Sequence, residues 1–193
     1  MNQRRDHDYN EEARTYDATR GGDLRAIAAA EALHALLPAG VPVLDIGGGT
    51  GIVADFLVKL GHPTTVIDSS PEMIRMCESR GTVPTVLSDA TAMPYENGSI
   101  DNAIMIWLLH IVDDPAPFIT EVARVLKSGG RFITTVDKLM SNNPDHDRAR
   151  TDAPELISRL CREVGFAEGP RSSFVGHGQR NDPLYQLAVF DRL

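Results

Sequence analysis

The sequence predicts an α/β fold: a doubly wound, mostly parallel sheet of seven strands with helices on both faces. Short apolar, β-prone segments alternate along the chain with longer segments whose apolar residues recur at helical spacing. The first strand runs directly into a glycine-rich turn and a helix, which is how a βαβ unit opens. The 193 residues contain no internal repeat and no linker. We therefore expect one domain over residues 23–193, preceded by an N-terminal segment over residues 1–22.

The first half of the chain alternates helix and strand. Helices are predicted over residues 23–37, over residues 52–60 and from residue 69 onwards, and strands over residues 43–46, 64–68 and 83–87. Asp23 can cap the first helix, whose apolar residues share one face. Ser69 and Glu72 have capping-box spacing at the start of the third helix.

The second half continues the pattern and ends in a hairpin. Helices are predicted over residues 113–126 and 155–164, and strands over residues 102–107, 131–136, 172–175 and 185–190. The run Lys127–Gly130 is interpreted as a C-terminal glycine turn that ends the helix before it. The last two strands flank a turn, so they should close the sheet as an edge hairpin with one antiparallel strand.

The turn after the first strand has the features of a ligand site. Gly47, Gly49 and Gly51 allow positive φ and close approach of a ligand to the main chain, and the next helix points unpaired N–H groups at the turn. Asp45 adds a negative charge. Asp68 ends the second strand, 23 residues after Asp45, where a carboxylate can accept hydrogen bonds from both hydroxyls of a ribose. A nucleotide-like ligand is expected; a tight turn without a ligand, and a helix cap at Asp68, are the alternatives.

Four motifs carry a resemblance to a known family. Residues 45–51 match D-x-G-x-G-x-G, residues 16–20 match Y-D-x-x-R, residues 93–101 resemble L-P-F-x-D-x-S-F-D, and residues 126–130 resemble L-K-P-G-G. With these motifs, residues 14–137 resemble class I S-adenosylmethionine-dependent methyltransferases with a type-11-like domain. The resemblance implies a Rossmann-like sheet of strand order 3-2-1-4-5-7-6, with S-adenosylmethionine as the cofactor.

The resemblance also implies a set of site residues. Those expected to bind the cofactor are Tyr16, Arg20, Asp45, Gly47, Gly49, Asp68, Ser69, Met73, Asp89, Ala90, Ile106 and Trp107. Residues 1–22 would act as a lid, in which Tyr16 packs near the methionine end and Arg20 meets its carboxylate. Asp89 would meet the adenine amino group and Met73 the adenine face. A solvated helix start is the alternative for the lid motif.

His110 is the candidate catalytic residue. It follows the fourth strand, at the edge of the sheet where the acceptor should lie, and its pKa range suits a general base. A buried packing histidine is the alternative. The resemblance implies methyl transfer to an oxygen or nitrogen of a small-molecule acceptor, with secondary metabolism as a candidate setting.

Two other functions are compatible with parts of the sequence. One is a non-catalytic protein that binds adenosylmethionine. The other is an NAD(P)-dependent oxidoreductase, which is disfavoured because the third glycine falls one residue too early for G-x-G-x-x-G and no Tyr-x-x-x-Lys pair is present.

Composition excludes several partners. A net charge of −8 argues against a nucleic-acid backbone, and no apolar run is long enough for a membrane span. Two cysteines form no disulfide framework, so a cytoplasmic setting is expected. No metal site is expected either: the run Asp145–Asp147 is interpreted as a solvated loop. The composition sets no oligomeric state.

Overall fold

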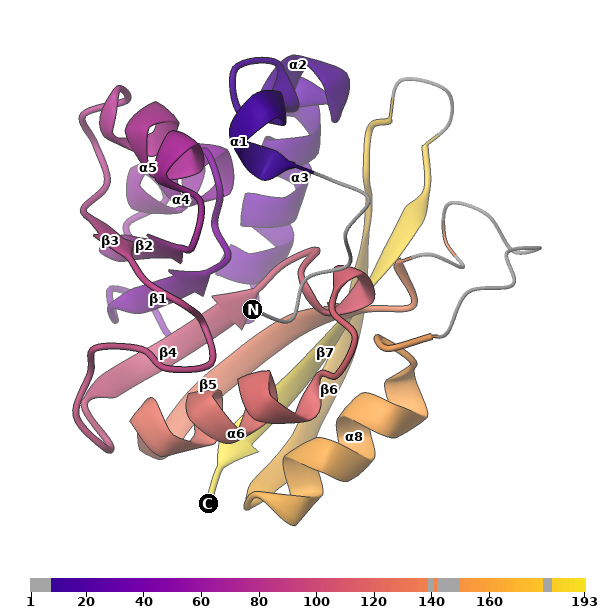
Figure 1. Ribbon diagram of the computed structural model, residues 1–193. Coiled ribbons are helices and arrows are strands. Elements are labelled where there is room, and N and C mark those ends of the chain that lie inside the picture. Colours follow the sequence, from indigo (N-terminus) through magenta and orange to yellow (C-terminus); the bar gives the residue numbers. More distant parts are fainter. Residues whose placement is uncertain (1–7, 139–140, 142–149, 179–181) are drawn as a thin grey trace.

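The computed structural model describes residues 8–138, 141, 150–178 and 182–193. The strands are β1 (Val43–Ile46), β2 (Thr64–Asp68), β3 (Thr85–Leu87), β4 (Ile100–Met105), β5 (Leu126–Val136), β6 (Phe166–Val175) and β7 (Leu184–Arg192). They form one sheet of order β3-β2-β1-β4-β5-β7-β6 (Figure 1). Strand β7 is antiparallel to β5 and to β6, and the other pairs are parallel. The predicted fold class and strand order are confirmed.

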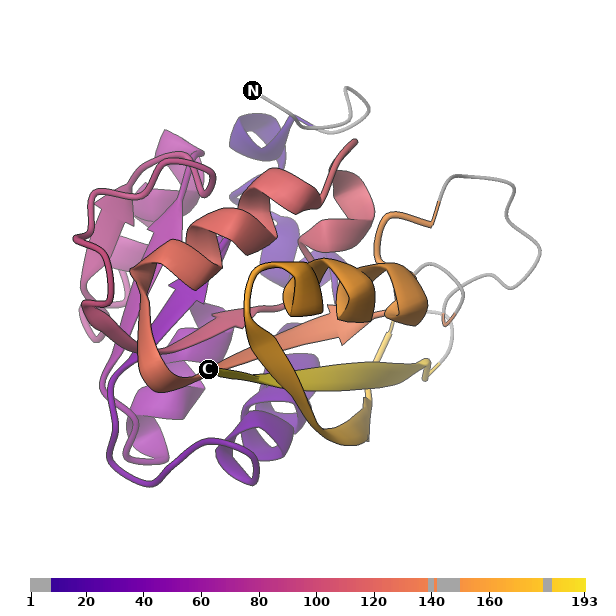
Figure 2. The ribbon, with the colours of Figure 1, turned by 90° about the horizontal axis from the view of Figure 1, so that it is seen from below.

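The helices are α1 (Tyr9–Glu12), α2 (Tyr16–Thr19), α3 (Gly22–His34), α4 (Ile52–Lys59), α5 (Pro71–Glu78), α6 (Ala116–Val125) and α8 (Pro154–Glu163), with a 3-10 helix, η1, at Leu109–Ile111. Helices α3, α4 and α5 cover one face of the sheet, and α6 and α8 cover the other (Figure 2). The side chains of β4 alternate between these layers. Ala103 and Met105 pack towards α6, whereas Ile104 and Ile106 pack towards α3.

Three local predictions were wrong. Helix α3 begins at Gly22 after a left-handed Gly21, so Asp23 lies in the first turn and is not the cap. The cap of α5 is Ser70, whose Oγ accepts a hydrogen bond from the Met73 N–H at 3.2 Å, and not Ser69. Pro71 explains the difference, because proline favours the first helical position and keeps the residue before it extended.

The third correction concerns the run Lys127–Gly130. Helix α6 ends at Val125, and Leu126 already has extended backbone and pairs with Ile100 of β4. The register between β4 and β5 then shifts, so that Asn102 faces Arg131. The glycine run is therefore an irregular start to β5 and not a C-terminal helix turn. Backbone pairing to β4 outweighs the local turn preference.

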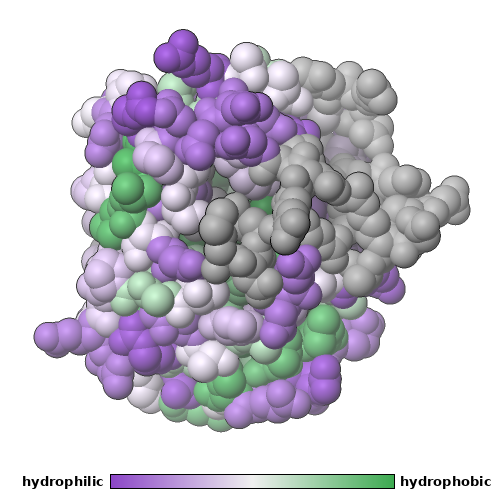
Figure 3. All heavy atoms as spheres, viewed as in Figure 1, coloured by the Kyte–Doolittle hydropathy of each residue, from purple (hydrophilic) through white to green (hydrophobic). Residues whose placement is uncertain are grey.

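The N-terminal helices α1 and α2 lie beside α5 and α3, at the top of the molecule in Figure 1. Asn10 of α1 accepts a hydrogen bond from the Ser70 hydroxyl at 2.8 Å. The same region presents mostly hydrophilic residues to solvent in Figure 3. The segment before α3 thus folds back over the start of α5, which places it above the glycine turn.

Candidate active site

A pocket opens at the carboxyl ends of β1, β2 and β4, where the strand order reverses between β1 and β4. It encloses about 400 Å³, part of which is open to solvent. Its wall consists of Tyr9, Tyr16, Gly47, Gly49, Asp68, Met73, Ile106, Trp107, Leu108 and Ile111. Tyr9, Leu108 and Ile111 were not singled out from the sequence, because only the tertiary structure brings α1 and η1 to this point.

The glycines of the turn are required by backbone conformation and by space. Gly47 and Gly49 have φ values of +70° and +57°. A Cβ at Gly47 would lie 2.9 Å from Cδ2 of Leu108, and one at Gly48 would lie 2.7 Å from Oδ2 of Asp45. Gly49 has room for a Cβ, because its nearest neighbour would be Sδ of Met73 at 3.7 Å. Gly49 is therefore the position where a side chain would intrude on the pocket.

Asp68 is held in a fixed orientation on the pocket wall. Its carboxylate accepts hydrogen bonds from the Gly49 N–H at 3.0 Å and from the Ser70 N–H at 2.8 Å. Burial raises the pKa of Asp68, and these backbone hydrogen bonds act in the opposite direction. A preoriented carboxylate at the end of β2 can accept hydrogen bonds from vicinal hydroxyls, as the sequence predicts.

Asp45 lies beneath the turn and does not form part of the pocket wall. Its residue is only 3% exposed, and its carboxylate packs against Gly48. Burial raises the pKa of Asp45 to about 7, and the charge of Asp68 adds to the shift. A buried carboxylate and a partly buried one that repel each other form a site that a cation would stabilise.

Asp17 connects the N-terminal segment to the glycine turn through a hydrogen bond with Thr50. Its carboxylate accepts a hydrogen bond from the Thr50 hydroxyl at 2.6 Å and forms an ion pair with Arg80. Arg80 also donates to the carbonyl oxygen of Thr50 at 2.7 Å. The contact places Tyr16 on the pocket wall, where its ring meets the ring of Tyr9 edge-on at 6.2 Å. The Y-D-x-x-R motif predicted that this segment lies near the cofactor, but it did not predict the contacts of Asp17 with Thr50 and Arg80.

Arg20 is placed differently from the prediction. Its guanidinium pairs with Glu12 at 3.0 Å, its side chain is 40% exposed, and it does not form part of the pocket wall. Arg25 of α3 is the buried arginine, with only 7% exposure. One of its Nη atoms donates to the carbonyl oxygen of Arg20 at 2.9 Å, and its Nε has no hydrogen-bond partner among the described residues. The sequence offered a signal, since Arg25 is in helical register with Ala29 and Leu33.

Trp107 connects Arg25 to the pocket. The Arg25 guanidinium lies 3.5 Å from the centre of the Trp107 ring, which also packs against Phe174 and Tyr185. Trp107 has a φ of +60°, which is rare and strained for a bulky residue, and its N–H donates to the Thr135 hydroxyl at 2.8 Å. The predicted pair Ile106 and Trp107 therefore does line the pocket, with its backbone held by β5.

Of the remaining predicted cofactor residues, Ser69, Asp89 and Ala90 lie outside the pocket wall. Asp89 is exposed, and it accepts hydrogen bonds at 2.8 Å from both the N–H and the hydroxyl of Thr91, which lower its pKa. Ser69 is exposed, and Ala90 packs against the core next to α6. Met73 is buried and does reach the pocket. The adenine assignments of Ser69, Asp89 and Ala90 stay predictions.

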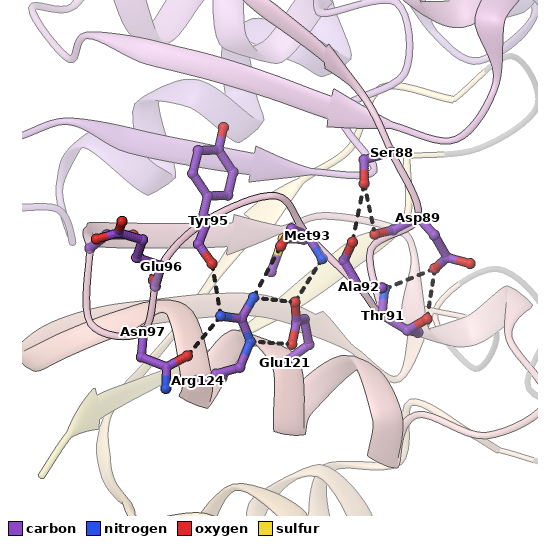
Figure 4. Close-up of polar contacts among 11 residues, drawn as sticks. Ser88, Asp89, Thr91, Ala92, Met93, Tyr95, Glu96, Asn97, Glu121 and Arg124 are labelled. Atoms are coloured by element: carbon purple, nitrogen blue, oxygen red, sulfur yellow. Dashed lines mark hydrogen bonds and ion pairs between the residues drawn. The ribbon is translucent and has the colours of Figure 1, made fainter.

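The loop that follows Asp89 is held to α6 by two charged residues (Figure 4). Glu121 accepts a hydrogen bond from the Met93 N–H at 2.7 Å, and Arg124 donates to the carbonyl oxygens of Met93 at 3.0 Å and Tyr95 at 2.8 Å. Glu121 and Arg124 also form an ion pair at 2.7 Å. The motif of residues 93–101 is therefore fixed by its backbone, on the side of the sheet that carries α6.

His110 lies in η1, next to the pocket. Its residue is 7% exposed, and the wall of the pocket includes Leu108 and Ile111 but not His110. The Thr151 hydroxyl donates to the carbonyl oxygen of Leu109 at 2.8 Å and fixes this turn. The catalytic role of His110 stays a prediction.

The described part of the chain supports neither a metal site nor a membrane-spanning helix. Its histidines, cysteines and acidic residues form no group of three or more that could hold a metal ion. The run Asp145–Asp147 lies outside the described residues. None of the described helices is long and apolar enough to cross a membrane.

Comparison with known proteins identifies the family. Residues 44–134 match the family model for a methyltransferase domain. An uncharacterised methyltransferase of Mycobacterium tuberculosis is 40% identical over 149 residues, which are 68% of this chain and 60% of that protein. A fatty-acid O-methyltransferase of Mycolicibacterium smegmatis is 32% identical over 133 residues, which are 66% of this chain and 48% of that protein.

Solved structures support the fold. A SAM-dependent methyltransferase from Thermotoga maritima matches with a TM-score of 0.72 at 23% identity, over 95% of each chain. Residues 44–134 therefore carry a methyltransferase domain, in agreement with the class I S-adenosylmethionine-dependent methyltransferase family that the motifs predict. Adenosylmethionine is the cofactor of this family, which sets aside the nicotinamide alternative. The chain spans 60% and 48% of the lengths of the two relatives described above.

Proposed function

We propose that this chain transfers a methyl group from adenosylmethionine to a small-molecule acceptor. The observation that carries the proposal is the position of Asp68 on the pocket wall, at the switch point of the sheet. The glycine turn fixes its carboxylate through the Gly49 N–H, and Tyr9 and Tyr16 of the N-terminal segment line the same pocket. The donor's sulfonium supplies an already activated methyl group. The protein must therefore bind, align and exclude water, rather than generate a strong electrophile.

The donor would lie along the pocket wall. Asp68 would accept hydrogen bonds from the ribose, and Met73 would contact the base. The methionine end would lie near Gly47 and Trp107, where Arg25, rather than Arg20, would meet the carboxylate because its guanidinium is buried beside Trp107 and Arg20 is already paired. The buried Asp45 would favour the positive charge of the donor.

The acceptor would approach from the carboxyl end of β4. Transfer to oxygen fits the fatty-acid O-methyltransferase relative, and transfer to nitrogen is the second possibility. His110 would act as a base if the acceptor is protonated at working pH. A pH–rate profile of the wild type and His110→Ala tests this role: a base requires a rate loss of roughly 10²–10⁴, and alignment alone predicts a loss below about tenfold.

The net charge of the chain bears on whether it binds nucleic acid. We propose no nucleic-acid partner, because the net charge is −8. A cytoplasmic setting and the assignment of residues 1–22 as a lid remain part of the proposal.

The experiment is calorimetry of adenosylhomocysteine, followed by its release in turnover over an acceptor panel. Asp68→Ala should weaken binding by about 1.5–3 kcal/mol, because it removes charge-assisted hydrogen bonds. Glu31→Ala, at an exposed position of α3, is the matched control and should bind normally. Unchanged affinity in a folded Asp68→Ala protein would overturn the donor assignment. Tight binding without turnover over the whole panel would instead support a non-catalytic binding protein.

A further inference from the structure

Helix α1 is docked on the start of α5 by the side chain of Asn10. Its Oδ1 accepts a hydrogen bond from the Ser70 hydroxyl at 2.8 Å and a longer one from the Glu72 N–H at 3.4 Å. Ala13, which follows the last residue of α1, is only 2% exposed, so the helix is also packed on its apolar side. Because a helix of four residues has little stability of its own, these contacts determine where α1 lies.

Ser70 connects this contact to Asp68 on the pocket wall. The Ser70 N–H donates to Asp68 Oδ1 at 2.8 Å, and the Ser70 hydroxyl, which donates to Asn10, also accepts a hydrogen bond from the Met73 N–H at 3.2 Å. Asp68 Oδ2 in turn accepts from the Gly49 N–H at 3.0 Å. A continuous set of hydrogen bonds therefore runs from α1 through Ser70 and Asp68 to the glycine turn.

Tyr9 is the residue that α1 contributes to the pocket. It lies on the pocket wall together with Asp68 and Met73, and its ring is half-buried. Asn10, the next residue along the chain, is bound to Ser70, which contacts both Asp68 and Met73. Tyr9 therefore belongs to the end of the pocket that is assigned above to the ribose and the base of the donor.

We propose that the ring of Tyr9 binds the nucleoside half of the donor, and that Asn10 is a positioning residue that holds Tyr9 in place. This inference rests on the proposed methyl transfer and adds a binding contact from α1 to it. An aromatic ring offers a large contact area and has few side-chain torsions to fix on binding. Asn10 does not form part of the pocket wall, so it acts through Tyr9.

The test compares adenosylhomocysteine with methylthioadenosine, which keeps the nucleoside and lacks the amino-acid group. Calorimetry measures both affinities, by competition where binding is weak. Tyr9→Ala should weaken the binding of both ligands by about tenfold or more, and to a similar extent, because the contact is made to the part that they share. Tyr9→Phe keeps the ring and should bind both within about threefold of the wild type.

The positioning role of Asn10 is tested in a double-mutant cycle. Asn10→Ala should weaken the binding of both ligands by about three- to tenfold, because the hydrogen bonds to α5 are lost. In the Tyr9→Ala background the same substitution should cost less than about twofold, because no ring is left to position. Losses that simply add in the double variant would contradict the positioning role.

Asn97→Ala is the matched control. Asn97 Oδ1 accepts a hydrogen bond from Arg124 at 2.8 Å, in the loop that is held to α6 (Figure 4). The substitution therefore removes an equivalent hydrogen bond at a residue that does not form part of the pocket wall. Both ligands should bind this variant as they bind the wild type. Circular dichroism and urea unfolding show that each variant is folded.

The outcomes separate the two proposals. If the wild type binds neither ligand, the proposed function is wrong, and this inference is wrong with it. If a folded Tyr9→Ala protein binds both ligands as the wild type does, the contact from Tyr9 is wrong while the proposed function stands. The same conclusion follows if the wild type binds adenosylhomocysteine but not methylthioadenosine, or if Tyr9→Ala weakens only the binding of adenosylhomocysteine.

Discussion

At the scale of single residues, the site depends on two carboxylates with different surroundings. Asp68 is exposed to the pocket and held by backbone N–H groups, whereas Asp45 is buried beneath the turn. Because the two carboxylates repel each other, ionising both in the empty site is unfavourable, and the positive charge of a bound donor offsets this repulsion. Donor binding should therefore be coupled to proton release.

The first prediction concerns this coupling. Since the pKa of Asp45 is about 7 in the empty protein, Asp45 is protonated below that pH, while a cationic donor favours its carboxylate form. Adenosylmethionine affinity should therefore rise as pH increases towards 7 and level off above it, with proton release that calorimetry in buffers of different ionisation enthalpy can measure. Asp45→Asn should bind less tightly by roughly 1–2 kcal/mol, with no pH dependence in this range. An unaltered pH dependence in that variant contradicts the assignment.

The second prediction concerns the glycine turn. Gly49→Val should abolish donor binding, because the side chain would enter the pocket from a backbone with a φ of +57°. Gly61→Val is a control with similar backbone strain, since Gly61 has a φ of +91° and nothing within 4 Å of an added Cβ. Urea unfolding should show a similar loss for both variants, about 1–2 kcal/mol. Equal donor affinity in both variants would mean that the turn does not cradle the ligand.

At the scale of elements, polar side chains connect the described part of the N-terminal segment to the glycine turn and to α5. Asp17 bonds to Thr50 and Arg80, and Asn10 bonds to Ser70. Because such contacts are individually weak, the segment can open for ligand exchange without unfolding the sheet. The rate of exchange should depend on the contacts of Asp17.

The third prediction is that Asp17→Asn speeds dissociation of adenosylhomocysteine by roughly three- to thirtyfold, because it removes a partly buried ion pair and leaves the sheet intact. Stopped-flow fluorescence of Trp107 measures the rate. Arg75→Met is the control, since the partner of Arg75 among the described residues is Glu72, within α5 itself. If Asp17→Asn releases the ligand no faster than this control, the segment does not act as a lid.

At the scale of the whole molecule, the final hairpin completes both the core and the site. Phe190 of β7 packs between Phe132 of β5 and Phe166 of β6, at ring distances of 6.1 and 6.5 Å. The opposite face of β7 carries Tyr185, which supports Trp107. The antiparallel edge therefore supports Trp107 of the pocket wall and also forms part of the core.

The fourth prediction follows from this packing. Phe190→Ala should lower the free energy of unfolding by about 3–5 kcal/mol, because it leaves a large cavity at a position that is 1% exposed. Leu184→Ala, at an exposed position of the same strand, should cost less than about 0.5 kcal/mol. Urea unfolding compares the two, and a loss near that of Leu184→Ala would show that the hairpin is not part of the cooperative core.

The sequence by itself determined the features that depend on neighbours along the chain. The strands, the helices and the glycine turn are patterns of neighbouring residues, so the fold class and the placement of Gly47, Gly49 and Asp68 could be predicted from them, whereas the strand order was predicted from the family resemblance. The position of Arg20 could not be predicted in this way, because it depends on the ion pair with Glu12. The conformation of the glycine run before Arg131 could not be predicted either, because it depends on pairing with β4.

Only the tertiary structure decided which polar groups meet across elements. Arg25 and Lys138 are 113 positions apart in the chain, and nothing local in either segment indicates the other. They act on each other because α3 packs on the sheet beside Trp107 while β5 ends near the same point. Long-range packing sets burial, and burial shifts the pKa of such groups.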